Sequence, residues 1–340
     1  MHKSLVLTEA LSIPEKINYL ASNDYNNYTE LSKLIFKKKF QYIVTIARGT
    51  SDCAALYASY MFAKHLGLPT YSMPPSIITL EKSKFDFTKA LVIIISQSGM
   101  SEDLVQCELA AKKMGATTIL ISNNTESPII NNANLFYHIN AGEEKSVAAT
   151  KSFVLTLVII IKIIFSCKEK IDINEHIKIL GENLLLDSSN QWNYKIFDRS
   201  INIGFVVSRG VGLAISNEIS LKFKELCQEM IEPFSSAEVM HGPKSLIENS
   251  FKVFTISLRD NSGNVVKKDS AEITKLTNLH YEISYNKENK NNLFYNPYEF
   301  QELDPIIILS KFYPWIINYA FEKNLDPDNP RYLTKVTRTF

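Results

Sequence analysis

Apolar and polar positions alternate along the chain in blocks that predict strands and helices in turn. A continuous apolar run at 90–95 and largely apolar segments at 41–47 and 117–122 predict strands, and helical spacing follows at 52–65 and 102–113. A short strand at 136–140 and a long helix at 146–165 are expected on the same grounds. Strands that alternate with helices predict an α/β fold in which helices cover both faces of a parallel sheet.

The second half of the chain repeats the first at a constant offset. Arg209-Gly210 follows a predicted strand at 203–208, as Arg48-Gly49 follows the strand at 41–47, and the offset is 161 residues. The same 161 residues separate Ser96 from Ser257 at the ends of two further strands. Shifted elements fall on a strand-like segment at 279–285 and a helical one at 305–321. This regular spacing predicts two copies of one α/β unit.

The repeat and the length of 340 residues predict a tandem two-domain organisation. The expected segments are an N-terminal helical cap (1–35), a first domain (36–166), a helical connector (167–199), a second domain (200–325) and a C-terminal tail (326–340).

The strand at 90–95 delivers a polar loop to a helix N-terminus. Unpaired backbone N–H groups and the positive end of the helix dipole favour an anion there. Ser96, Gln97, Ser98 and Ser101 add donors without charge, and Gly99 lets the backbone come close to a ligand. The loop predicts a site for the phosphate of a small molecule. The alternative is a strand-to-helix turn that is merely rich in capping residues.

The corresponding loop of the second copy differs in charge. Leu258-Arg259-Asp260 stands where the first copy has Gln97-Ser98-Gly99, and Asp260 would repel an anion. We therefore expect one phosphate loop per chain.

Composition excludes several other classes. Lysine plus arginine (37) nearly balances aspartate plus glutamate (36), so no basic excess points to nucleic acid. The four cysteines are widely spaced and form no metal-binding pattern, which is typical of a reduced, cytoplasmic protein. No signal peptide is visible at the N-terminus. The apolar segment 153–165 contains Lys162 and is too short to span a bilayer, so we expect a buried helix and no membrane partner.

Six motifs in order identify the chain as a member of the sugar isomerase (SIS) family, in its tandem-domain branch. They are Arg48-Gly-Thr-Ser51, Ser96-Gln-Ser-Gly99, Val147-Ala-Ala-Thr-Lys151, Glu218-Ile-Ser-Leu-Lys222-Phe-Lys-Glu225, His241-Gly-Pro243 and the tail from Asp326 to Lys335. The chain resembles the isomerase half of glucosamine-6-phosphate synthase and, in style, the stand-alone SIS-type glucosamine-6-phosphate deaminases.

The resemblance implies residues that bind the substrate. It implies phosphate contacts from Ser51, Ser96, Gln97, Ser98 and Ser101. It also implies that Val147 and Ala149 line the sugar. The synthase has serine where Ala149 stands, and the loss of this hydroxyl leaves the identity of the hexose open.

The resemblance also implies the residues that carry the chemistry. Glu225 matches the carboxylate that moves a proton between C1 and C2, and Glu218 and Lys222 match its neighbours. His241 matches the histidine that opens the sugar ring and that the adjacent subunit supplies, which implies a homodimer. Lys335 matches a lysine that reaches the open-chain sugar.

The spacing of Glu218, Lys222 and Glu225 agrees with these roles. Positions i, i+4 and i+7 lie on one face of a helix. A surface stripe of ion pairs would show the same spacing. The apolar residues between them, such as Ile219 and Phe223, favour a buried helix instead. A buried carboxylate beside a lysine is suited to be a tuned general base.

The expected reaction is the hydrolysis of glucosamine 6-phosphate to fructose 6-phosphate and ammonia. His2 follows Met1 where the synthase has a nucleophilic cysteine, and no room is left for a glutaminase domain, so free ammonia is the expected nitrogen species. We expect neither a metal nor an organic cofactor. The alternatives are another amino-sugar phosphate, such as galactosamine or fructosamine 6-phosphate, and a sugar-phosphate sensor. The first 35 residues are too short and too poor in basic residues for the DNA-binding domain of a sensor.

Overall fold

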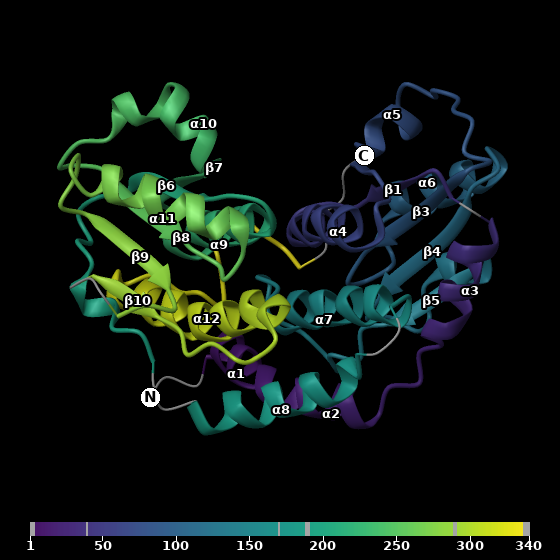
Figure 1. The fold of residues 1–340 in the computed structure, drawn as a ribbon, viewed down its shortest axis with the longest axis horizontal. Helices are drawn as coiled ribbons and strands as arrows, with labels where there is room; N and C mark the ends of the chain where they lie inside the picture. The colour runs from purple at the N-terminus through teal and green to yellow at the C-terminus, as the bar shows by residue number, and fades with distance from the viewer. Residues whose placement is uncertain (1–3, 39, 169–170, 188–190, 288–290, 336–340) are drawn as a thin grey trace. The chain divides into compact units, whose positions relative to one another are not determined.

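The described residues form two β-sheets, each made of five parallel strands (Figure 1). This computed structural model describes residues 4–38, 40–168, 171–187, 191–287 and 291–335. The predicted fold class, α/β with two tandem SIS-type units, is confirmed.

The first sheet has the order β2-β1-β3-β4-β5, and all of its neighbouring strands are parallel. Its strands are β1 (Tyr42–Ile46), β2 (Thr70–Ser72), β3 (Ala90–Ile95), β4 (Thr117–Ser122) and β5 (Leu135–His138). The accompanying helices are α2 (Ile13–Ser22), α3 (Tyr28–Lys38), α4 (Thr50–Leu66), α5 (Pro75–Thr79), α6 (Glu102–Lys113), η1 (Pro128–Asn131) and α7 (Lys151–Ser166). Every residue of β3 and β4 is buried, including Thr117, Thr118 and Ser122 of β4, which is expected of central strands in a parallel sheet.

The second sheet has the equivalent order β10-β9-β8-β6-β7 and is also parallel. Its strands are β6 (Ile203–Ser208), β7 (Met230–Ser235), β8 (Lys252–Ile256), β9 (His280–Ser284) and β10 (Asn292–Phe294). Its helices are α9 (Val211–Cys227), α10 (Ser236–His241), η4 (Pro243–Leu246), α11 (Asn261–Ile273), η5 (Gln301–Leu303) and α12 (Asp304–Glu322). The remaining helical elements are α1 (Leu5–Leu11), α8 (Ile173–Leu186) and η3 (Tyr194–Ile196).

Two glycines show the repeat at the level of the backbone. Gly49 precedes α4 with φ 56° and ψ −134°, and Gly210 precedes α9 with φ 60° and ψ −135°. This conformation is essentially confined to glycine. The Arg-Gly pairs 161 residues apart therefore make the same turn from strand to helix.

Contacts divide the chain into two discontinuous units. The first-sheet unit contains residues 15–144, 151–179 and the chain from Thr334 onward. The second-sheet unit contains the chain up to Pro14, residues 145–150 and residues 180–333. The contiguous segment boundaries drawn from the sequence remain predictions.

The helix predicted at 146–165 begins later than expected. Helix α7 starts at Lys151, and residues 145–150 are not helical. The carboxylate of Glu144 accepts hydrogen bonds from the backbone N–H of Ser152 at 3.1 Å and from its hydroxyl at 2.6 Å, which satisfies a donor in the first turn of the helix. Residues 153–165 are buried, as expected, and among the described residues we find no helix long and apolar enough to cross a membrane.

Candidate functional site

The predicted phosphate loop follows β3 at the point where the order of the first sheet reverses. Helix α4 connects β1 to β2 on one side, and α6 connects β3 to β4 on the other. In open α/β sheets, ligands bind outside the carboxyl ends of the strands at such a switch point. Residues 96–99 leave β3 at this position and lead into α6 (Figure 1).

Hydrogen bonds within the loop fix its conformation. The hydroxyl oxygen of Ser96 accepts from the N–H of Gly99 at 3.1 Å, and that of Ser98 accepts from Met100 at 3.3 Å. Gly99 has φ 60°, and a Cβ atom there would lie 2.5 Å from the Ser127 hydroxyl oxygen, so only glycine fits. The oxygens of both serines accept these bonds, which leaves their hydroxyl protons available to an anion.

The other predicted phosphate ligands lie at the same edge of the sheet. Ser101 is the N-cap residue of α6, but its side chain makes no capping hydrogen bond. Ser51 lies in the first turn of α4, just after β1, which pairs with β3. Gln97 is half-buried, like Ser51 and Ser101. The parallel pairing places the ends of both strands, and hence these groups, at one edge.

A cation at this edge was missed by the sequence analysis. The guanidinium Nε of Arg48 forms an ion pair with Asp103, in the first turn of α6. The Asp103 side chain is 1% exposed, whereas that of Arg48 is 43% exposed. The Arg48 side chain is therefore the part of this ion pair that is open to solvent. The sequence places Arg48 in the repeat and in a family motif, but neither pattern predicts its contact with Asp103.

The corresponding helix N-terminus of the second sheet is already satisfied. Asp260 is the N-cap residue of α11, and its carboxylate accepts a hydrogen bond from the N–H of Gly263 at 2.7 Å. Arg259 pairs with the buried Asp304 at 2.6 Å. The negative charge of Asp260 therefore occupies the position that phosphate would take in the first copy.

Helix α9 brings Glu218, Lys222 and Glu225 into contact. The Lys222 ammonium lies 2.6 Å from the carboxylate of Glu225 and 3.3 Å from that of Glu218. The Glu218 and Lys222 side chains are 0% exposed, but that of Glu225 is 21% exposed. A surface stripe of ion pairs is thus excluded. Glu225 is the carboxylate of the three residues that a molecule from solution can reach.

Burial changes the chemistry of Glu218. Desolvation raises its pKa to about 7, although the nearby Lys222 opposes the rise. The hydroxyl of Tyr313 donates to Oε1 of Glu218 at 2.9 Å, while Oε2 has no hydrogen-bond partner among the described residues. Near neutral pH this carboxyl group is therefore partly protonated. The two glutamates beside Lys222 are not equivalent.

His241 is the last residue of α10 and is exposed. Its ring has no hydrogen-bond partner within the part of the chain that the structure describes. Gly242 and Pro243 follow it and lead into η4, so the predicted turn after the histidine is present.

The predicted sugar-lining residues and the tail lysine have different surroundings. Val147 and Ala149 are half-buried in the non-helical segment 145–150, which belongs to the second-sheet unit together with α9 and α10. Lys335 belongs to the first-sheet unit, where its ammonium lies 3.3 Å from the buried carboxylate of Glu144. The predicted phosphate loop, residues 96–101, lies in that unit as well, and we call it the serine loop.

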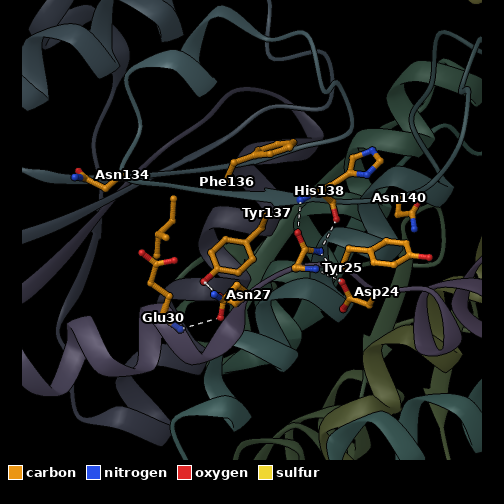
Figure 2. A pocket seen from close by; sticks show the side chains of 11 residues that line it. Asp24, Tyr25, Asn27, Glu30, Asn134, Phe136, Tyr137, His138 and Asn140 are labelled. Carbon is orange, nitrogen blue, oxygen red and sulfur yellow. Dashed lines mark hydrogen bonds between the residues drawn. The ribbon is translucent and has the colours of Figure 1, made fainter.

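A cavity of about 420 Å³ beside β5 contains none of the predicted site residues (Figure 2). Its polar groups are paired with one another. Asn26 donates to the carbonyl of His138 at 2.9 Å and accepts from its N–H at 2.7 Å, and the buried Asp24 pairs with Lys162 of α7. These bonds cover part of the free edge of β5 and fasten the α2–α3 connection to it. We interpret this region as structural.

Comparison with known proteins agrees with the motifs. Residues 34–163 match the SIS domain family. The family resemblance inferred from the sequence motifs is thus confirmed. The glutamine–fructose-6-phosphate aminotransferase (isomerizing) of Sulfolobus acidocaldarius is 28% identical over 341 residues, covering 97% of this chain and 56% of that protein. The same enzyme of Sulfurisphaera tokodaii is 30% identical over 313 residues, covering 88% and 50%. The chain thus spans about half the length of these curated relatives.

Solved structures share the fold over nearly the whole chain. A proposed phosphosugar isomerase from Silicibacter pomeroyi DSS-3 is 29% identical with a TM-score of 0.87, covering 96% of this chain and 100% of that one. The C-terminal domain of a glucosamine-fructose-6-phosphate aminotransferase from Francisella tularensis has a TM-score of 0.82 at 21% identity, covering 97% and 99%. A glucosamine-6-phosphate deaminase from Thermotoga maritima has a TM-score of 0.78 at 19% identity, covering 98% and 100%. At these lower identities the likeness establishes the fold alone.

Proposed function

We propose that this SIS-domain protein converts glucosamine 6-phosphate and water to fructose 6-phosphate and ammonia. The observation that carries the proposal is the unequal pair of glutamates beside Lys222 on α9. Glu218 is fully buried, whereas Glu225 is partly exposed and lies 2.6 Å from the lysine. One accessible carboxylate held by a buried cation is what a proton transfer between adjacent carbons requires.

In this proposal the serine loop binds the phosphate. Ser51, Ser96, Gln97, Ser98 and Ser101 offer neutral donors at the switch point of the first sheet, and the N-terminus of α6 adds its dipole. Binding the end of the substrate that does not react orients the carbons that do. Val147 and Ala149 would line the sugar.

The reaction then proceeds by proton transfers on the substrate. His241, supplied by the second subunit of a homodimer, transfers the proton that opens the pyranose ring. Glu225 removes the proton from C2, and the electron pair forms the C1–C2 double bond of an enolamine. Return of the proton to C1 leaves a C2 ketimine, and water hydrolyses it to the ketone and ammonia. The carbonyl of the substrate is the electron sink, so no step is assigned to a cofactor.

The neighbours of Glu225 have supporting roles in this proposal. Lys222 holds the Glu225 carboxylate in place and is itself buried. Glu218 orients Lys222 from the other side. Lys335 would leave Glu144, its partner in this structure, to reach the open-chain sugar.

The proposal is tested by incubating the purified protein with glucosamine 6-phosphate. We expect fructose 6-phosphate, by a coupled enzymatic assay, and ammonia in equal amounts. Glu225→Gln protein is the control for a contaminating activity. Ketose without ammonia would replace the deaminase by a simple isomerase, and the absence of both products would refute the proposal.

One residue leaves the identity of the amino sugar open. Ala149 provides no hydroxyl where the synthase has serine, so a contact to the sugar is missing. Galactosamine and fructosamine 6-phosphates therefore belong in the same assay. A higher kcat/KM for either one would assign the protein to that amino sugar.

A further inference from the structure

We propose that α1 is a supporting element of the sugar site and that Glu9 is the positioning residue through which it acts. The inference rests on the proposed function, since Val147 and Ala149 line a sugar only if that function holds. Helix α1 precedes the segment that matches the SIS family, which begins at residue 34.

Glu9 holds the backbone directly before Val147. One oxygen of its carboxylate accepts from the N–H of Lys145 at 2.7 Å. The other accepts from the N–H of Ser146 at 3.2 Å and also from the Ser146 hydroxyl. Glu9 is only 5% exposed, and a carboxylate acceptor makes such bonds stronger than neutral ones. A residue far away in the sequence thus sets the position of this segment.

Helix α1 is itself anchored within the second-sheet unit. The carboxylate of Asp328 accepts from the N–H groups of Leu5 and Val6 at 2.9 and 2.8 Å and from the Ser4 hydroxyl at 3.0 Å. A carboxylate at this end of a helix also complements the helix dipole. Val6 is buried, and α1 packs against α12. The helix is therefore a fixed support rather than a loose arm.

The bonds from Glu9 serve the segment and not the helix that follows it. In the first turn of α7, the backbone N–H of Ser152 is bound by Glu144. Glu9 instead binds Lys145 and Ser146, outside α7. Removing the Glu9 carboxylate should therefore displace Val147 and Ala149 without unfolding α7. Phosphate binding, which we assign to the serine loop, should not respond.

Glu9→Gln tests the inference, with Glu15→Gln as the matched control because Glu15 is exposed in the next helix. A carboxamide offers one acceptor and turns an N–H donor toward the N–H groups of residues 145 and 146. We expect faster hydrogen exchange at the amides of 145–150 in Glu9→Gln than in the wild-type protein or in Glu15→Gln. Titration calorimetry is done in a Glu225→Gln background, in which the substrate is not consumed. There, Glu9→Gln should weaken the binding of glucosamine 6-phosphate at least about tenfold, while inorganic phosphate binds as before. Ser146→Ala removes one donor from the opposite side and should give a smaller change of the same kind.

Each outcome decides a separate point. Unchanged exchange at 145–150 in Glu9→Gln would overturn the positioning role. Equal losses of affinity for glucosamine 6-phosphate and for phosphate would also overturn it, because they indicate a general structural effect. If Glu225→Gln protein bound glucosamine 6-phosphate no better than inorganic phosphate, the proposed function would fail. The exchange data would then decide on their own whether Glu9 holds the segment.

Discussion

The carboxylate of Asp260 accepts a hydrogen bond from the N–H of Gly263 at 2.7 Å and so fills the N-terminus of α11. In the equivalent place of the first copy, the N-cap residue Ser101 of α6 makes no side-chain capping bond. In α6 the N–H of Leu104, the counterpart of Gly263, instead bonds the carboxylate of Asp103, which is paired with Arg48, at 2.9 Å. The two copies of this strand-to-helix turn thus differ in the N-cap side chain, which is acidic in the second copy and uncharged in the first. This difference predicts one anion site per chain.

Calorimetry with inorganic phosphate should therefore show one site per chain, and Ser98→Ala should weaken it. A lost hydrogen bond is worth about 0.5–1.5 kcal/mol, and more when its acceptor is charged. Ser96→Ala should weaken binding further, because Ser96 also holds the N–H of Gly99. Ser257→Ala is the matched control for Ser96→Ala, because Ser257 is its counterpart in the repeat. Equal effects of Ser96→Ala and Ser257→Ala would contradict the asymmetry.

Much of the fold was predictable because its central strands are rich in apolar residues. The predicted strands at 90–95, 117–122 and 203–208 coincide with β3, β4 and β6, because strands buried on both faces are rich in apolar residues. Strand β7 escaped prediction because it is an edge strand that contains Glu232 and Pro233 and is half-exposed. Strand β10 is only three residues long and depends on pairing with β9.

The site was predictable where its residues are close in sequence. Glu218, Lys222 and Glu225 share one helix, and their spacing alone places them together. Contacts that join distant segments were not predictable. Arg48 meets Asp103 only because β1 and β3 are neighbours in the sheet, and Glu9 meets Ser146 only after the chain has folded.

Replacing Arg48 should weaken phosphate binding although no motif role was assigned to it. Arg48→Met leaves the buried Asp103 without its cation, near the helix end where we propose that the anion binds. We expect at least about a tenfold loss of phosphate affinity, because a hydrogen bond to a charged group is worth about 1.5–3 kcal/mol. Arg48→Lys keeps the charge but loses the planar fork, so its affinity should be intermediate. Wild-type affinity in Arg48→Met, measured by calorimetry, would exclude Arg48 from the anion site.

Glu218 should make the stability of the protein depend on pH above the usual pKa of a glutamate, 4.5. Burial raises its pKa from 4.5 to about 7, so between these values the folded chain keeps a proton that the unfolded chain has lost. The stability that this group contributes is complete below pH 4.5 and is lost as the pH rises through 7. The glutamine of Glu218→Gln cannot ionise. Between pH 5 and pH 8 the free energy of unfolding of this variant should therefore rise relative to that of the wild-type protein, by on the order of 1–3 kcal/mol.

Denaturant titrations at several pH values check this prediction, with Glu272→Gln as the exposed control. A difference between Glu218→Gln and wild type that does not change with pH would show that Glu218 titrates normally.

Mixing two inactive variants should restore activity if His241 acts in a neighbouring subunit. His241→Ala lacks the ring-opening group, and Glu225→Gln lacks the base. A hybrid dimer would contain one site with both groups intact, so up to about half of the normal activity per hybrid dimer is expected. Subunit exchange is verified separately by mass spectrometry of tagged chains. If exchange is complete and the mixture stays inactive, the site is made within one chain.

Glu225→Gln should abolish turnover while substrate still binds. Glutamine keeps the shape of the side chain but cannot accept the C2 proton, and general acid–base groups contribute about 10²–10⁴-fold to rate. Affinity for inorganic phosphate should be unchanged, because the serine loop supplies those contacts. Glu232→Gln is the control, since Glu232 also pairs with a lysine, Lys224, at 2.9 Å, but on the surface. Exchange of the C2 hydrogen with solvent deuterium, followed by NMR, separates proton abstraction from later hydrolysis. Normal exchange in Glu225→Gln would remove this residue from the mechanism and leave Glu218, 3.3 Å from Lys222, as the next candidate base.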